Sequence, residues 1–106
     1  MPSFVLLYSG GAGMPETEAE QAAVMQAWGA WFGSLGEALV DGGNPFTPMS
    51  KSIKSNGTVS DSPIVAGANG YTIIKADSLD DAVEKSKGCP NLQSGEVTIY
   101  ETFPVM

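Results

Sequence analysis

The sequence predicts an α+β domain of the split βαβ, ferredoxin-like type, with an antiparallel sheet. The predicted elements follow one another as strand, long helix, hairpin, strand, short helix and strand, and right-handed crossovers turn that order into two helices on one face of the sheet. A chain of 106 residues is long enough for one hydrophobic core and too short for two. We therefore expect a single domain over residues 1–106.

The first strand is predicted over residues 4–8, a short apolar run that stops at the turn-rich residues 9–13. This glycine-rich stretch lacks both the Lys-Ser/Thr ending of a phosphate-binding loop and the glycine spacing of a dinucleotide site. It is predicted to be a flexible connection.

A long helix is predicted next, because Thr17 and Glu20 form a capping box and three acidic residues lie near its positive end. The apolar stripe continues to residue 39 and the glycines at 42–43 supply a stop, so the expected length is about 24 residues. Gly29, Gly33 and Gly36 flank the stripe. Close approach of a neighbouring backbone is the favoured explanation for them, and room for a ligand is the alternative.

The second half of the chain alternates strands with turns. A loop is predicted over residues 44–48, then a hairpin whose strands, 50–54 and 58–60, flank an Asn-Gly turn. After a loop over residues 61–69, a strand is expected at 71–76, a capped helix at 78–87 and a last strand at 96–103.

The first strand is apolar on both faces, which predicts a dimer. Phe4, Leu6 and Tyr8 point to one side and Val5 and Leu7 to the other. Leaving either set in water costs about 1.5 to 3 kcal/mol for each large side chain. A second copy that packs sheet against sheet removes this cost, and the same face can include Tyr71, Ile73, Thr98 and Tyr100.

The composition excludes several kinds of chemistry and partner. The net charge is −7, with no Arg and no His, so binding to nucleic acid or to an anionic membrane surface is not expected. Without His there is no His general base and no His-activated nucleophile, and we expect no metal site and no cofactor. The single Cys89 is predicted to be a packed thiol, and with no signal or membrane segment recognised, the expected location is the cytoplasm.

Several runs of the sequence resemble the YCII-related (DGPF-type) family. They are Ala-Trp-Gly-Ala-Trp at 27–31, residues 35–43, Gly-Tyr at 70–71 with residues 76–83, and Gly-Cys-Pro at 88–90. The resemblance implies a ferredoxin-like fold that pairs into a dimeric α+β barrel. It implies little about activity, although some relatives look like small lyases or dehalogenating enzymes that use a His and an Asp.

The chain departs from that family at two positions. The Asp-Gly-Pro-Phe motif appears as Asp-Ser-Pro-Ile at residues 61–64, and Asn91 stands where a His commonly follows Cys-Pro. A His-Asp mechanism therefore does not carry over, because the chain contains no imidazole.

Three hypotheses for the function follow. The first is a homodimeric binding or accessory protein that accepts a small organic ligand between the long helix and the sheet; the alternative for the aromatic residues is that they fill the core. The candidate pocket residues are Tyr8, Trp28, Trp31, Ser62, Tyr71, Asn91 and Tyr100. The second is a lyase or isomerase in which Asp61 is the general base, with an ordinary turn-capping Asp as the alternative. The third is a structural or regulatory dimer with a protein partner.

Overall fold

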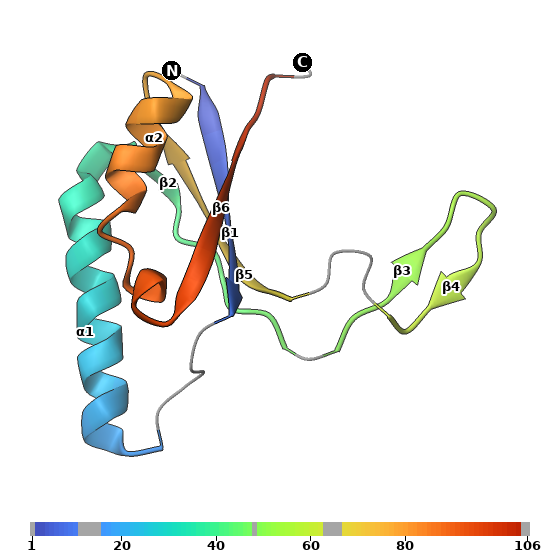
Figure 1. The fold of residues 1–106 in the computed structure, drawn as a ribbon, viewed down its shortest axis with the longest axis horizontal. Helices are drawn as coiled ribbons and strands as arrows, with labels where there is room; N and C mark the ends of the chain where they lie inside the picture. The colour runs from blue at the N-terminus through green and yellow to red at the C-terminus, as the bar shows by residue number, and fades with distance from the viewer. Residues whose placement is uncertain (1, 11–15, 48, 63–66, 105–106) are drawn as a thin grey trace.

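A four-stranded antiparallel sheet with two helices on one of its faces forms the body of the protein (Figure 1). The computed structural model describes residues 2–10, 16–47, 49–62 and 67–104. The elements are β1 (Ser3–Gly10), α1 (Glu18–Leu35), β2 (Leu39–Asp41), β3 (Ser52–Ile53), β4 (Val59–Ser60), β5 (Ala68–Lys75), α2 (Leu79–Ser86) and β6 (Gly95–Glu101), with short 3₁₀ turns at Gly36–Ala38 and Pro90–Gln93.

The strand order is β2-β5-β1-β6, so that β1 lies in the middle and β6 at an edge. Because every neighbouring pair is antiparallel, residues opposite one another share a face. Val5 lies between Ile73 and Tyr100 in the register. The alternation predicted for β1 is therefore present, with one set of side chains toward the helices and the other away from them.

The core lies between the helices and the sheet. Phe4, Leu6 and Ile74 are fully buried there, and Val97 and Ile99 of β6 pack against them. Every second residue of β1 and β5 is buried, which is the pattern of a sheet covered on one face.

Helix α1 is shorter than the sequence predicts, and the prediction that it extends to about residue 41 is wrong. It ends at Leu35, where Gly36 adopts a φ of 56° and donates its backbone N–H to the carbonyl of Phe32. The chain then forms the short strand β2, which pairs with β5 at the edge of the sheet. Leu39 continued the helical stripe in the sequence, but in the structure it pairs with Ile74.

The glycines on α1 also differ from expectation. A Cβ added at Gly29 or Gly33 meets no atom within 4 Å, so no neighbouring backbone approaches them. Gly43 is the position that needs glycine: its φ is 71°, and a Cβ there lies 1.8 Å from the Tyr71 carbonyl oxygen.

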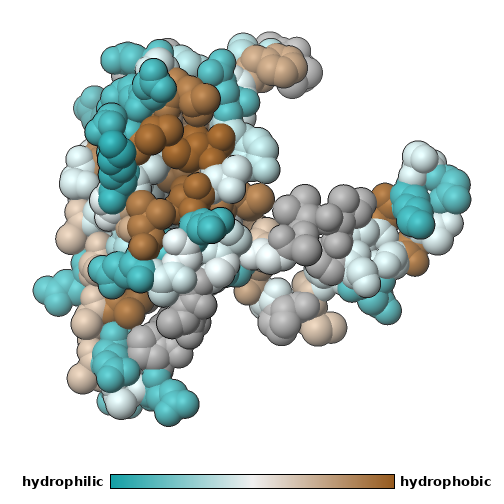
Figure 2. All heavy atoms as spheres, in the orientation of Figure 1, coloured by the Kyte–Doolittle hydropathy of each residue, from teal (hydrophilic) through white to brown (hydrophobic). Residues whose placement is uncertain are grey.

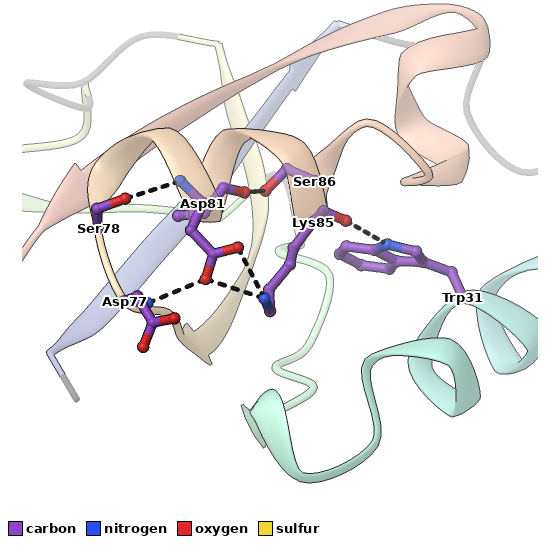
Figure 3. Close-up of polar contacts among 7 residues, drawn as sticks. Trp31, Asp77, Ser78, Asp81, Lys85 and Ser86 are labelled. Carbon is purple, nitrogen blue, oxygen red and sulfur yellow. Dashed lines mark hydrogen bonds and ion pairs between the residues drawn. The ribbon is translucent and has the colours of Figure 1, made fainter.

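Helix α2 has the predicted N-cap at Ser78 and is attached to α1 by a tryptophan (Figure 3). The Ser78 side chain accepts from the Asp81 N–H, and Lys85 donates to both carboxylate oxygens of Asp81 at 2.9 Å. The Asp77 N–H donates to Asp81 Oδ2 at 3.0 Å, and this bond, followed by the contact with Lys85, lowers the pKa of Asp81. The indole N–H of Trp31 donates to the Lys85 carbonyl at 3.1 Å, which fixes α2 beside α1.

The predicted hairpin is present as β3 and β4, joined by a turn in which Gly57 has a φ of 88°. We call residues 49–62, which contain this hairpin, the arm. It projects from the side of the sheet away from the helices (Figure 1). Parts of two predicted loops, residues 11–13 and 63–66, lie outside the described residues.

Candidate functional site

The sheet face opposite the helices is the most distinctive surface of the body. We call it the open face; it consists of Val5, Leu7, Tyr71, Ile73, Thr98 and Tyr100. These residues come from β1, β5 and β6 and form two rows across the sheet. No helix of the described part of the chain covers them (Figure 1).

The open face is apolar but only partly buried. Val5, Leu7 and Ile73 are half-buried, because neighbouring strands shield them, and Tyr100 is 52% exposed. Apolar surface of this kind gains free energy when it is removed from water, at roughly 25 cal/mol per Å². The face therefore has the character of a contact surface.

Phe46 extends this surface at the root of the arm. Its ring stacks on Tyr71 with the ring centroids 6.0 Å apart, and its backbone N–H donates to the Asn69 carbonyl at 2.8 Å. Pro45 forms a β-bridge with Gly70 beside it. Sequence reasoning missed Phe46, since it lies in a proline-containing loop without periodicity. The signal that could have found it was an isolated aromatic residue in such a loop.

Three of the pocket candidates lie on the other side of the sheet. Tyr8, Trp28 and Trp31 form an aromatic cluster with Phe32 in the space between α1 and the sheet. The ring centroids of Tyr8 and Trp28 are 5.3 Å apart, and those of Trp28 and Trp31 are 5.8 Å apart. Tyr8 and Trp31 are 6% and 5% exposed, so their rings fill the core at this place.

Two ionisable groups in this core are held in their neutral forms. The Tyr8 hydroxyl donates to Thr72 Oγ1 at 2.5 Å, and burial raises its pKa. Burial likewise raises the pKa of the Cys89 thiol, which is 3% exposed. A buried neutral thiol is a poor nucleophile, because the thiolate is the reactive form.

The remaining predicted site residues do not form one site, because Asp61 and Ser62 lie on the arm and Asn91 lies in the turn after α2. Asp61 is on the arm, where its side chain is 87% exposed and Oδ1 accepts from Lys51 Nζ at 2.6 Å. Ser62 is exposed beside it. Asn91 donates through Nδ2 to the carbonyls of Ser9 and Glu96 and so joins the ends of β1 and β6. A carboxylate acts as a base near neutral pH when it is buried, and the single chain does not bury Asp61.

A shallow groove of about 580 Å³ runs between α1 and the segment that follows α2. Its lining residues are Ala27, Ala30, Trp31, Ser34, Lys87, Gly88, Cys89, Pro90, Leu92 and Gln93. Two of its polar groups already have partners: the Trp31 N–H bonds to the Lys85 carbonyl, and Lys87 pairs with Glu84 at 2.7 Å. The groove is open to solvent along its length, unlike a pocket that encloses a ligand.

A second apolar surface lies over α2 and β6 (Figure 2). Its exposed members include Leu79 and Val83 on α2, with exposed fractions of 43% and 38%. It lies on the edge of the sheet rather than on the open face.

Within the described residues, no group of three or more His, Cys, Asp or Glu side chains is arranged to hold a metal ion. None of the helices in that same part of the chain combines the length and apolar character needed to span a bilayer. In comparisons with known proteins, no family model and no curated protein matches the chain.

Proposed function

We propose that this protein acts as a homodimer, a ferredoxin-like domain whose open face packs against the same face of a second copy, as in the dimeric α+β barrels of the YCII-related family. The observation that carries the proposal is the row of apolar side chains on the open face, opposite both helices. A two-fold contact joins the same patch on both subunits, and a self-complementary apolar sheet face meets that requirement.

The dimer is proposed to bind a small organic molecule between its two sheets, as a binding or accessory protein. Tyr71 and Tyr100 place two phenol groups on the open face, and sites of this type combine apolar walls with a few polar tips. The chain has no His, so the function does not rest on His-dependent catalysis.

Sedimentation of the intact chain at micromolar concentration tests the dimer. We expect the wild type to sediment as two copies and Ile73→Glu to sediment as one, because the substitution places a charge in the apolar contact. The matched control is Val83→Glu on α2, which lies outside the open face and should leave the dimer intact. A wild-type monomer, or an Ile73→Glu dimer of unchanged affinity, would contradict the proposal.

Thermal unfolding with a panel of small aromatic compounds and hydroxy acids tests ligand binding. A compound present at 100 times its dissociation constant stabilises the folded state by about 2.7 kcal/mol. We expect at least one class to raise the melting temperature, and Tyr71→Ala to weaken that effect relative to Thr17→Ala at the start of α1. Failure of every compound across the panel would overturn the ligand part and leave the dimer standing.

A further inference from the structure

The packing of the helices on the sheet does not account for the position of the arm. It leaves the sheet on the side of the open face and extends away from it (Figure 1). Its two strands are short: Ser52 pairs with Ser60 and Ile53 with Val59, and the Lys54 N–H donates to the Thr58 carbonyl at 2.8 Å. An isolated two-stranded hairpin is marginally stable in water, and packing on a second surface would stabilise it.

The arm has one apolar side and one polar side. Ile53 and Val59 are opposite one another in the register, so their side chains lie together, and they are 69% and 55% exposed. Ser52 and Ser60 form the next pair and point the other way. This two-sided pattern is typical of a hairpin with one face covered.

The surface area of the chain is large enough for an extensive contact. Its accessible surface is 7414 Å², whereas a compact folded protein of 11.0 kDa has about 5,600 Å². The radius of gyration is 15.3 Å, against about 13 Å for a compact chain of this length. The surplus of about 1,800 Å² exceeds the roughly 800 Å² that each partner contributes to a standard interface.

Charge is also distributed unevenly between the arm and the body. The arm has a formal charge of +1, from Lys51, Lys54 and Asp61. Because the whole chain carries −7, the rest of it carries −8. The body of a second copy therefore has a net charge opposite in sign to that of the arm and attracts it, whereas the two bodies have the same sign and repel each other.

We infer that the arm of one copy reaches past the sheet-to-sheet contact and packs Ile53 and Val59 on the second copy, so that each subunit is held by its partner's arm. This inference rests on the proposed dimer. Seven extended residues from the arm's base to its tip span about 23 Å, while packed sheets lie about 10 Å apart, so the arm extends beyond the partner's sheet.

Photo-crosslinking of the full chain tests this arrangement. A benzophenone amino acid is placed at position 59 on the arm or, as the control, at position 25 on α1, where Met25 is 65% exposed. Sedimentation of each sample records the oligomeric state before irradiation. We expect position 59 to give a covalent dimer on a denaturing gel, with the attachment mapped to the other copy, and position 25 to give none.

A paired substitution provides the second measurement. Ile53→Ser with Val59→Ser is expected to raise the dimer dissociation constant at least tenfold, while Met25→Ser leaves it unchanged. A dimer that sediments normally but forms no arm crosslink, and that tolerates the double substitution, overturns the inference and leaves the proposed dimer standing. A wild-type chain that sediments as a single copy overturns both.

Discussion

The Tyr8 hydroxyl begins a short chain of hydrogen bonds inside the core. It donates to Thr72 Oγ1, and Thr72 donates in turn to the Gly42 carbonyl at 3.0 Å. The chain joins β1 and β5 to the segment after β2 and satisfies a buried hydroxyl pair that would otherwise cost free energy. Cys89 lies near the same hydroxyl, so two acids with raised pKa values share this part of the core.

This arrangement predicts that stability falls at alkaline pH. A raised pKa means that the folded state keeps a proton that the unfolded chain releases, so the contribution is complete below the ordinary value and is lost as pH rises past it. The loss begins above about pH 9 for Cys89, followed by Tyr8 above about pH 10. Each group lowers the free energy of unfolding by at most about 1.4 kcal/mol per pH unit.

Urea unfolding between pH 7 and pH 10.5 measures this dependence. Cys89→Ala and Tyr8→Phe should each flatten the alkaline decline, although both lower stability at pH 7. Met25→Ala on α1, which changes an exposed side chain without a titratable group, is the control and should keep the wild-type slope. Parallel declines in all four proteins would show that these two groups do not govern the dependence.

Gly29 and Gly33 lie inside a helix without a packing requirement for glycine. Because an added Cβ meets nothing within 4 Å, replacement by Ala should stabilise the chain by about 0.5 to 1 kcal/mol at each position. Gly43→Ala is the contrasting change and should be strongly destabilising, since the added Cβ collides with the Tyr71 carbonyl. Denaturant midpoints of the three variants test this, and a destabilising Gly29→Ala would indicate a neighbour at the outer face of α1.

At the scale of single elements, helix α2 depends on its N-cap. Ser78→Ala removes the acceptor for the Asp81 N–H and should lower the free energy of unfolding by about 1 kcal/mol. Ser78→Asp keeps an acceptor and should retain most of the stability. Urea midpoints compare the two variants, and equal losses would mean that the side chain at position 78 does not cap the helix.

Local sequence signals predicted the elements whose ends carry a capping residue or a turn motif. The caps at Thr17 and Ser78 and the Asn56-Gly57 turn lie where the sequence placed them. The end of α1 and the strand β2 were missed, because Leu39 kept the helical spacing beyond Gly36. A three-residue edge strand is held by its pairing with β5, which is information that a local pattern does not contain.

The candidate site was predictable in part. Alternation along β1 and β6 correctly grouped Val5, Leu7 and Tyr100 on one face, because the side-chain period of a strand is two. The pocket hypothesis joined Tyr71 and Tyr8 in one site, although they lie on opposite sides of the sheet. That distinction depends on register, which long-range pairing fixes.

For the whole molecule, the proposed dimer predicts that thermal stability depends on protein concentration. Two copies that unfold together should show a melting temperature that rises by about 3 °C for each tenfold increase in protein concentration. Ile73→Glu should abolish the dependence, and Val83→Glu should retain it. Calorimetry over a hundredfold range of concentration distinguishes the two cases, and a wild-type melting temperature independent of concentration would contradict a coupled dimer.

The central position of β1 has a consequence for how the chain folds. Its neighbours are β5 and β6, and the pair Phe4 and Glu101 joins positions 97 residues apart. The apolar strand must remain unpaired until distant segments find it, and closing such long loops is an entropic cost that precedes any gain. Acquisition of the native state is therefore slow relative to helical proteins of equal size, and the nascent chain carries an exposed aggregation-prone segment until then.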